Sequence, residues 1–234
     1  MYILLAAATA LEIQPTIDFL EGAPGSPPQA SSLRTLHETS VLTTGIGSLA
    51  ATHALMRSIG RRRPDLVIQA GIAGGFYSSS AAAPGAGDVF VIREEILADL
   101  GVWEDEKFRS LFDLRLAGRN DPPFSGGRLV NPHQELLALS GLRAVTSVTV
   151  NEITTDPRMI HWYQQNYAPV VESMEGGALH YTCLQEKIPF LQIRSISNPI
   201  GERDKAKWNI GLAVQNLNDG LIALFRNLDN TGTA

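Results

Sequence analysis

Seven apolar runs of strand length, separated by stretches with helical periodicity, constrain this chain more than any other feature of its sequence. The runs lie at 2–8, 40–44, 65–70, 88–93, 142–150, 169–172 and 189–196. Helical periodicity occupies 10–20, 48–60, 132–139, 155–166, 175–187 and 206–227. Runs that are apolar at consecutive positions are typical of strands buried on both faces. The alternation therefore predicts an α/β fold, a three-layer α/β/α domain with helices on both faces of a central mixed sheet.

Three polar stretches interrupt this pattern, at 21–32, 78–87 and 118–127. Each contains turn-forming residues such as Gly, Pro, Ser or Asn, and the composition does not change across any of them. We interpret them as loops rather than linkers. A chain of 234 residues fits one α/β domain, so residues 1–234 are expected to form a single domain.

Charge and composition exclude several classes of protein. The net charge of −5 supplies no basic field for nucleic acid. The apolar amino terminus has no positively charged start and is followed by Glu12 and Asp18, which favours a buried strand over a signal peptide. No apolar run approaches the roughly 18 to 20 residues of a membrane span. We expect a soluble cytoplasmic protein with no membrane or nucleic-acid partner.

Metal and thiol chemistry find little support in the sequence. The five histidines show no metal-ligand spacing, and we expect neither a metal nor another cofactor. The single cysteine, Cys183, cannot form an internal disulfide. His180 and Cys183 lie three positions apart on one predicted helix, where we expect both to pack against the sheet.

A glycine-rich turn at 45–50 imitates a dinucleotide-binding fingerprint. Its Gly-Ile-Gly-Ser-Leu-Ala sequence follows a predicted strand, and Asp65 lies 20 residues beyond Gly45. In a dinucleotide site the acid stands at the carboxyl end of the second strand, but Asp65 precedes the strand beginning at Leu66. An NAD-dependent oxidoreductase is therefore the weaker interpretation. The glycines more simply permit a tight turn and a close backbone approach.

A glutamate at the start of the predicted helix 175–187 is the first candidate for chemistry. Glu175 can accept hydrogen bonds from two neighbouring hydroxyls, such as those at the 2′ and 3′ positions of a ribose. Met174 would add an apolar surface against the sugar. From spacing alone, Glu175 can equally well serve only to favour the helix dipole.

Two further polar groups follow predicted strands. Asn198 lies just past the run 189–196, where α/β sheets bind ligands, although Asn is also common in turns. Glu12 follows the first run and can act as a general base for an attacking water. Because Thr9 and Glu12 also form a capping-box pattern, the sequence alone favours a helix cap for Glu12.

Taken in order, these segments resemble the family that includes methylthioadenosine/S-adenosylhomocysteine nucleosidases and purine nucleoside phosphorylases. The likeness covers most of the chain, and five motifs in register are specific although each is weak alone. The motifs are Glu12 after the first strand, Thr-Gly-Ile-Gly at 44–47, Ala-Gly-Ile-Ala-Gly-Gly at 70–75 with Gly-Asp-Val at 87–89, Glu-Ser-Met-Glu at 172–175, and Arg-Ser-Ile-Ser-Asn at 194–198.

The resemblance implies a role for each candidate. Glu12 would orient or deprotonate the attacking water, Glu175 would hold the ribose hydroxyls, and Asn198 would meet the leaving base near N7. The other positions that it assigns to substrate binding are Met174, the backbone of Ala73 and Gly74, and the base-pocket segment Asn151, Glu152 and Ile153. It also implies a homodimer or larger homo-oligomer, because relatives complete their pockets with a neighbouring subunit.

Two departures from the family pattern narrow the expected activity. Phosphorylase members carry a Gly-Asp-Pro-x-Arg segment for phosphate, whereas this chain has Ala-Ala-Thr-Ala-Leu at 7–11, which favours water as the nucleophile. Asn198 stands where adenine-specific nucleosidases carry Asp. An amide can donate to O6 of a base and accept from a protonated N7, which suits a 6-oxopurine and penalises a 6-amino group.

Within the family, the segments 98–103 and 198–210 resemble the subfamily that releases hypoxanthine from futalosine in menaquinone biosynthesis. Futalosine carries an aromatic carboxylate beyond its 5′ carbon, which cationic side chains can pair with and an indole can stack on. The side chains available for that group are Arg203, Lys205, Lys207 and Trp208. An exposed helix start would explain them equally well. A phosphorylase or an adenine-releasing nucleosidase of the same fold, and a nucleoside-binding protein without activity, remain the alternatives.

Overall fold

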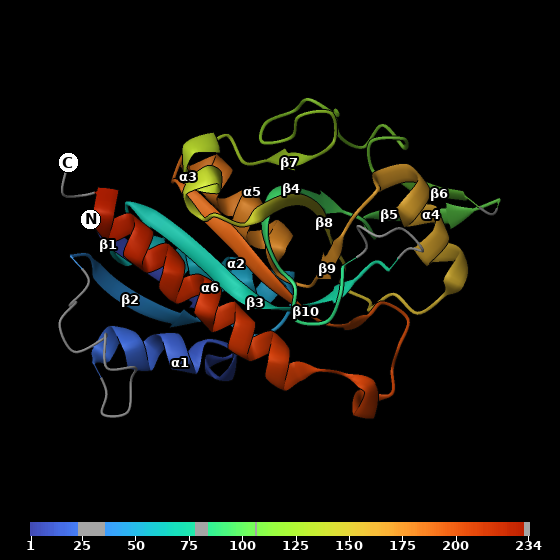
Figure 1. Ribbon diagram of the computed structural model, residues 1–234. Helices are drawn as coiled ribbons and strands as arrows, with labels where there is room; N and C mark the ends of the chain where they lie inside the picture. Colours follow the sequence, from blue (N-terminus) through green and yellow to red (C-terminus); the bar gives the residue numbers. More distant parts are fainter. Residues whose placement is uncertain (23–35, 78–83, 106, 232–234) are drawn as a thin grey trace.

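The computed structural model describes residues 1–22, 36–77, 84–105 and 107–231 (Figure 1). Its strands are β1 (Tyr2–Ala7), β2 (Glu38–Thr43), β3 (Leu66–Gly75), β4 (Val89–Leu97), β5 (Gly101–Glu104), β6 (Lys107–Ser110), β7 (Leu129–Val130), β8 (Arg143–Thr149), β9 (Val171–Ser173) and β10 (Phe190–Pro199). Its helices are α1 (Ala10–Glu21), α2 (Ser48–Arg61), α3 (Gln134–Leu139), α4 (Pro157–Tyr167), α5 (Gly176–Glu186), α6 (Ile210–Thr231) and the 3₁₀ helix η2 (Lys205–Lys207).

Each apolar run overlaps a strand and each periodic stretch overlaps a helix, so these predicted elements are confirmed, but the strands β5, β6 and β7 between the fourth and fifth runs were not predicted. Some boundaries were wrong. The third strand continues to Gly75 rather than ending at residue 70, and the last helix begins at Ile210 rather than 206. Residues 206 and 207 belong instead to the short helix η2, which ends at Lys207 before α6 starts at Ile210.

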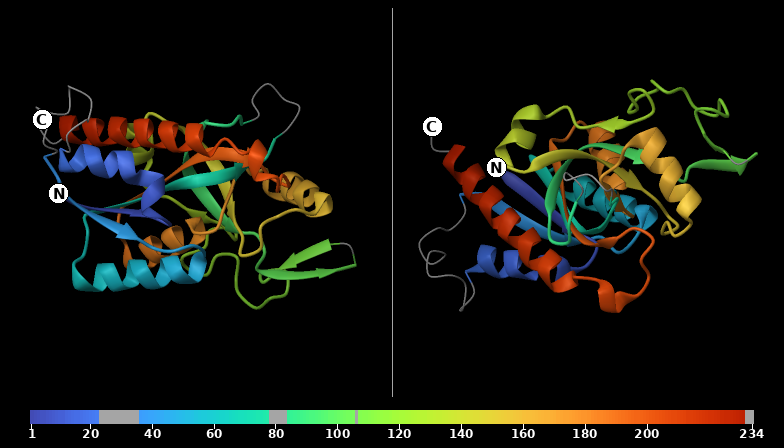
Figure 2. Two further views of the ribbon diagram at one scale, coloured as in Figure 1. Left: turned by 90° about the horizontal axis from the view of Figure 1, so that it is seen from below. Right: turned by 45° about the vertical axis from the view of Figure 1, so that its right-hand side comes forward.

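Alternate side chains of the central strands enter two separate cores, as expected for a three-layer α/β/α domain. Ile3 and Leu5 of β1 pack in the cluster that contains side chains of α1 and α6. Leu4 and Ala6 pack in the opposite cluster, with side chains of α2 and α5. Figure 2 shows α1 and α6 over one face of the sheet and α2 and α5 over the other. Each fully buried aliphatic side chain contributes about 1.5–3 kcal/mol to folding.

The sheet is mixed, as predicted, but it also closes on itself in a way that the sequence did not indicate. Its strand order is β10-β4-β8-β9-β3-β1-β2, and β10 pairs with β3 as well as β4. The strands β3, β10, β4, β8 and β9 therefore form a closed circuit, from which β1 and β2 extend. β3 makes this possible because it is 10 residues long, pairing with β1 near its start and with β9 at Gly74 and Gly75.

The hairpin β5–β6 was not predicted, because its two strands of four residues are too short to show a periodic pattern. It packs through Trp103, whose ring centroid lies 6.0 Å from that of Trp162 on α4. The predicted loop at 118–127 lies outside the helices and strands, while the predicted loops at 21–32 and 78–87 extend over residues outside the described part of the chain. Across the described residues, no helix is both long and apolar enough to cross a bilayer.

Three parallel strands end at the same edge of this sheet. β3 pairs in parallel with both β1 and β10, while the short strand β9 runs antiparallel to β3, with Val171 and Glu172 paired to Gly75 and Gly74 at the end of β3. The carboxyl ends of parallel strands are where open α/β sheets bind ligands. Of the polar groups singled out from the sequence, Glu12 and Glu175 follow β1 and β9, and Asn198 lies near the end of β10.

Candidate active site

A mainly apolar cavity of about 420 Å³ opens at the edge where β1, β3, β9 and β10 end. Cavities of this size commonly hold a small ligand that a few polar groups orient. Its lining includes most of the residues predicted for substrate binding or catalysis: Glu12, Ala73, Gly74, Ile153, Met174, Glu175, Asn198, Arg203 and Trp208. Glu172, Ser197 and Ile46 also line it, and the sequence did not single these out as site residues.

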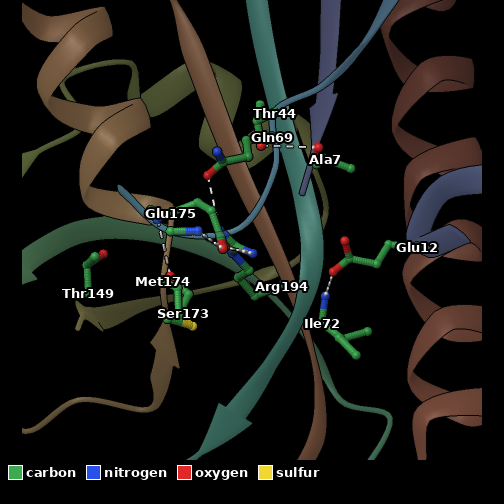
Figure 3. Close-up of polar contacts among 12 residues, drawn as sticks. Ala7, Glu12, Thr44, Gln69, Ile72, Thr149, Ser173, Met174, Glu175 and Arg194 are labelled. Atoms are coloured by element: carbon green, nitrogen blue, oxygen red, sulfur yellow. Dashed lines mark hydrogen bonds and ion pairs between the residues drawn. The ribbon is translucent and has the colours of Figure 1, made fainter. Parts of the chain in front are cut away.

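Glu12 takes part in capping the amino terminus of α1 and also lines the cavity. Its Oε2 accepts hydrogen bonds from the Thr9 backbone N–H at 2.9 Å and the Thr9 hydroxyl at 3.0 Å, which completes the capping box of α1. Its Oε1 accepts from the backbone N–H of Ile72 on β3 at 3.0 Å (Figure 3). The cap and the cavity position are therefore compatible, because the two oxygens face different partners.

Glu175 occupies the N-cap position of α5, but its side chain does not cap the helix. One carboxylate oxygen accepts from the Gly47 backbone N–H at 3.0 Å, and the other lies 3.4 Å from Nη1 of Arg194. The residue is only 5% exposed. The glycine-rich turn that imitates a dinucleotide fingerprint thus holds this carboxylate through Gly47, whose φ of +91° favours glycine.

Arg194 is the main residue that the sequence interpretation left without a role. It is 1% exposed, it forms an ion pair with Glu175, and its Nη2 donates to Oε1 of Gln69 at 3.1 Å. A Cβ on Gly71 would lie 2.5 Å from Arg194 Nη1 and 3.0 Å from Glu12 Oε1. Arg194 and Glu12 therefore approach each other most closely beside Gly71. A charged residue inside an apolar run was the available sequence signal.

A second polar cluster lies behind the first turn of α5 rather than in the cavity. Burial raises the pKa of Glu95 to about 7, although a hydrogen bond from Thr149 at 3.0 Å partly offsets the effect. Burial lowers the pKa of His180 to about 4, and its Nδ1 lies 2.9 Å from the Leu129 carbonyl oxygen. A Cβ on Gly176 would lie 2.4 Å from Glu95 Oε2, so the helix approaches this cluster closely. His180 and Cys183 are buried, as predicted.

Asn198 belongs to β10 rather than to a turn, so the alternative interpretation as a turn residue was wrong. The pairing of β10 with β3 shifts register between Ile196 and Asn198. The amide is oriented by its neighbours, because its Oδ1 accepts from the Ser197 hydroxyl at 2.8 Å and its Nδ2 donates to the Pro199 carbonyl oxygen at 2.9 Å. Each group keeps capacity for a further hydrogen bond toward the cavity.

Only one of the three residues predicted to line the base pocket lies in the cavity. Ile153 lines the cavity, whereas Asn151 and Glu152 are exposed and do not. The backbone N–H groups of both residues donate to the carboxylate of Asp99. That contact holds them on the outer side of the loop between β8 and α4.

Two of the four side chains predicted to bind the 5′ group, Arg203 and Trp208, line the cavity. The Arg203 guanidinium lies 5.4 Å from the centre of the Trp208 ring, and the indole N–H donates to the Glu202 carbonyl oxygen at 3.1 Å. Arg203 and Trp208 line the cavity, but Lys205 and Lys207 do not, and Lys207 pairs with Glu202 at 2.8 Å. In the described part of the chain, no group of three or more His, Cys, Asp or Glu residues is arranged to hold a metal.

Comparisons of this chain with a family model and with known proteins agree on one family. A family model described as the phosphorylase superfamily matches residues 2–226. Futalosine hydrolases from Acidothermus cellulolyticus and Streptomyces coelicolor are each 30% identical, covering 94% of this chain and 89% and 94% of their own lengths. A 5′-methylthioadenosine/S-adenosylhomocysteine nucleosidase from Geobacillus kaustophilus is 29% identical, covering 70% of this chain and 68% of its own.

Solved structures confirm the fold. A 5′-methylthioadenosine/S-adenosylhomocysteine nucleosidase from Colwellia psychrerythraea, in complex with adenine, matches with a TM-score of 0.76 at 21% identity. The match covers 97% of this chain and 96% of that one. A futalosine hydrolase mutant of Helicobacter pylori also gives 0.76, at 16% identity, covering 96% of this chain and 98% of that one.

Proposed function

The chain belongs to the phosphorylase superfamily, and we propose that it is a nucleosidase that hydrolyses the N-glycosidic bond of futalosine. The products would be hypoxanthine and dehypoxanthine futalosine, in menaquinone biosynthesis. The observation that carries this proposal is the 30% identity to futalosine hydrolases over 94% of the chain. The cavity adds a chemical argument, because its polar groups match the three parts of such a reaction.

Two carboxylates would act on the ribose and on the attacking water. Glu175 keeps acceptor capacity beyond its contacts with Gly47 and Arg194, which suits two ribose hydroxyls as the sugar becomes an oxocarbenium ion. Glu12 is held by Thr9 and Ile72 so that it can take a proton from an attacking water. Met174 would contact the sugar through its thioether side chain.

Hydrolysis is favoured over phosphorolysis by the distribution of positive charge. Arg203 is the only lysine or arginine among the described residues that line the cavity, and it lies at the mouth beside Trp208. The buried Arg194 is already engaged by Glu175 and Gln69. A phosphate dianion at the ribose would have no free cation there, whereas water needs only Glu12.

Different residues of the cavity would bind the base and the 5′ group. Asn198 would donate to O6 of hypoxanthine and accept from its protonated N7, and the backbone of Ala73 and Gly74 would form the floor near the ribose and the nucleophile. Arg203 would pair with the aromatic carboxylate and Trp208 would stack on its ring. Ile153 is the one member of its segment that this arrangement uses.

We further propose that residues 1–234 act as one domain of a cytoplasmic homodimer or larger homo-oligomer. Leu11 and Ile46 support the assembly, because both line the cavity and yet are 80% and 66% exposed. Exposed apolar side chains at the rim of a site are typical of an interface. The molar mass in solution tests this, and a monomer would contradict it.

Incubation with futalosine, inosine and methylthioadenosine, each with and without phosphate, tests the proposed reaction. We expect hypoxanthine to be released from futalosine at the same rate in both conditions. Release that requires phosphate would identify a phosphorylase instead. Preference for methylthioadenosine would identify the adenine-releasing activity of the second group of relatives. Saturable binding without any product would identify a nucleoside-binding protein.

Asn198→Asp tests the basis of the base preference. An aspartic acid can protonate N7 beside a 6-amino group, whereas it cannot donate to O6 in its ionised form. We expect the ratio of kcat/KM for futalosine to that for methylthioadenosine to fall at least about tenfold, within the range that one mismatched polar group gives. An unchanged ratio would show that Asn198 does not read the base.

A further inference from the structure

Glu175 stands at the N-cap of α5, yet its carboxylate leaves the first amides of that helix to other acceptors. A residue at this position commonly uses its side chain to accept from the second or third amide of the helix. The Glu175 carboxylate instead contacts the Gly47 N–H and Arg194. Because the first amides of a helix have no partner within it, the buried ones need acceptors from elsewhere in the fold.

Two hydroxyl groups at the ends of neighbouring strands supply these acceptors. Ser173 Oγ of β9 accepts from the Gly176 N–H at 3.3 Å. Thr149 Oγ1 of β8 accepts from the Gly177 N–H at 2.7 Å. Ser173 and Thr149 are paired in register, so their side chains are neighbours at the start of α5 (Figure 3). Gly177 is the second residue of α5, so Thr149 binds the amide that an N-cap side chain would otherwise take.

The hydroxyl of Thr149 is fixed in the accepting direction by Glu95 of β4. A threonine hydroxyl has one proton and can donate or accept, whereas a backbone N–H only donates. Glu95 Oε1 accepts the Thr149 proton at 3.0 Å, which leaves the lone pairs of Thr149 Oγ1 for the Gly177 N–H. Glu95 is fully buried and Thr149 is 2% exposed, so bulk water does not compete for either hydrogen bond.

The helix lies close enough to the sheet for this contact because its first residues have no side chains. A Cβ on Gly177 would lie 2.4 Å from Leu97 Cδ2 and 3.3 Å from Thr149 Oγ1. A larger residue at this position would push the start of α5 away from β4 and β8. The amide of Gly177 would then lose its contact with Thr149.

We propose that Thr149 and Glu95 are positioning residues for the carboxylate of Glu175, an inference that rests on the proposed function. Thr149 caps α5 from a separate strand, and Glu95 keeps the Thr149 hydroxyl available as an acceptor. Glu175 therefore need not cap its own helix, and its carboxylate stays directed at Gly47 and the ribose. Neither Thr149 nor Glu95 lines the cavity, so both act through Glu175 rather than on the substrate.

Thr149→Val tests the cap, because valine keeps the shape of the side chain and lacks the hydroxyl. The Gly177 N–H is then buried without an acceptor, and the Glu175 carboxylate can turn from the ribose to bind it. We expect kcat/KM for futalosine to fall about ten- to a hundredfold, as for other small displacements of a binding group. Thr149→Ser keeps the hydroxyl and should restore most of the rate.

Thr146→Val is the matched control. Thr146 lies on the same strand and also donates its hydroxyl to a glutamate, Glu94, at 2.6 Å, but among the described residues it binds no amide of α5. It should keep wild-type turnover. Glu95→Met is the second test variant, because it removes the acceptor for Thr149 and should also lower kcat/KM. Glu95→Gln keeps an oxygen for the Thr149 hydroxyl and should restore most of that loss.

A double-mutant cycle distinguishes positioning from a general loss of structure. In the Glu175→Gln background no carboxylate remains to be positioned, so Thr149→Val should lower kcat/KM less than about twofold there. An equal loss in both backgrounds overturns the proposal. Wild-type turnover of Thr149→Val or of Glu95→Met overturns it as well, and so does an equal loss in Thr146→Val.

Hydrogen exchange of backbone amides in the free protein separates this inference from the proposed function. In Thr149→Val the Gly47 N–H loses its acceptor when the Glu175 carboxylate turns away, so it should exchange about tenfold faster. The Ile72 N–H, which Glu12 binds, should exchange as in the wild type. Unchanged exchange at Gly47 overturns the positioning role. If Gly47 responds as expected but the wild type releases no base from futalosine, only the futalosine assignment fails.

Discussion

Glu12→Gln is expected to lower kcat for futalosine about a thousandfold, within the usual contribution of a general base. Glutamine has a single carbonyl oxygen, so it can keep either the contact with the Ile72 N–H or the contacts with Thr9, and it cannot take a proton from water. Loss of one reciprocal cap contact should cost only about 1 kcal/mol of stability. Single-turnover kinetics and urea unfolding of the same preparation measure both effects.

Thr9→Ala is the control for the cap, because it removes the hydroxyl contact of the capping box and keeps the Glu12 carboxylate. We expect a similar loss of stability but less than about a tenfold loss of turnover. If Glu12→Gln retains wild-type turnover, Glu12 is only a cap and the water must be activated by another group.

Glu175→Gln is expected to reduce kcat/KM on the order of a thousandfold and to lower the free energy of unfolding by about 3 kcal/mol. The loss of activity follows because an amide is a weaker acceptor than a carboxylate for two ribose hydroxyls. The loss of stability follows because Arg194, 1% exposed, would keep a buried charge without its partner. Steady-state kinetics and urea denaturation test the two parts separately.

The double variant Glu175→Gln with Arg194→Met separates the effect of the ion pair on stability from the effect of Glu175 on ribose binding. Replacing both charges by neutral groups is often neutral for stability, whereas removing one is costly. The double variant should therefore recover much of the lost stability while activity stays low. Equal instability of the single and double variants would show that the Arg194–Glu175 pair does not govern folding of this region.

Several parts of this protein follow from local patterns in the chain. The apolar runs specify strands buried on both faces, and alternate side chains of β1 do enter opposite cores. Glu12, Glu175 and Asn198 became candidates because each lies near the end of an apolar run, where α/β sheets bind ligands, but only the family resemblance assigned them to one site, and all three line the same cavity. The interpretation of 45–50 as a turn permitting close backbone approach was also possible from its glycines.

Other parts depended on contacts between residues far apart in the chain. Nothing in the sequence near β10 indicates that it pairs with both β3 and β4, since register and closure are set by the packed sheet. Asn151 and Ile153 are two positions apart, yet the Asp99 contact holds the first outside the cavity and leaves the second in its lining. A sequence pattern cannot show which of two nearby residues a contact with a distant residue will hold outside the cavity.

Glu175, the residue proposed to bind the ribose, shows most clearly what the sequence could predict and what only the tertiary structure decided. Glu175 was recognisable from the chain alone, but its buried partner Arg194 and its amide donor Gly47 become its neighbours only after β10 and the start of α2 pack beside α5. The pairing of Thr149 with Ser173 at the start of α5 is likewise a product of strand register. The sequence determined which chemical groups this protein carries at the ends of its strands. Only the tertiary structure decided which of them are buried together, because burial and long-range register are properties of the packed sheet rather than of any segment.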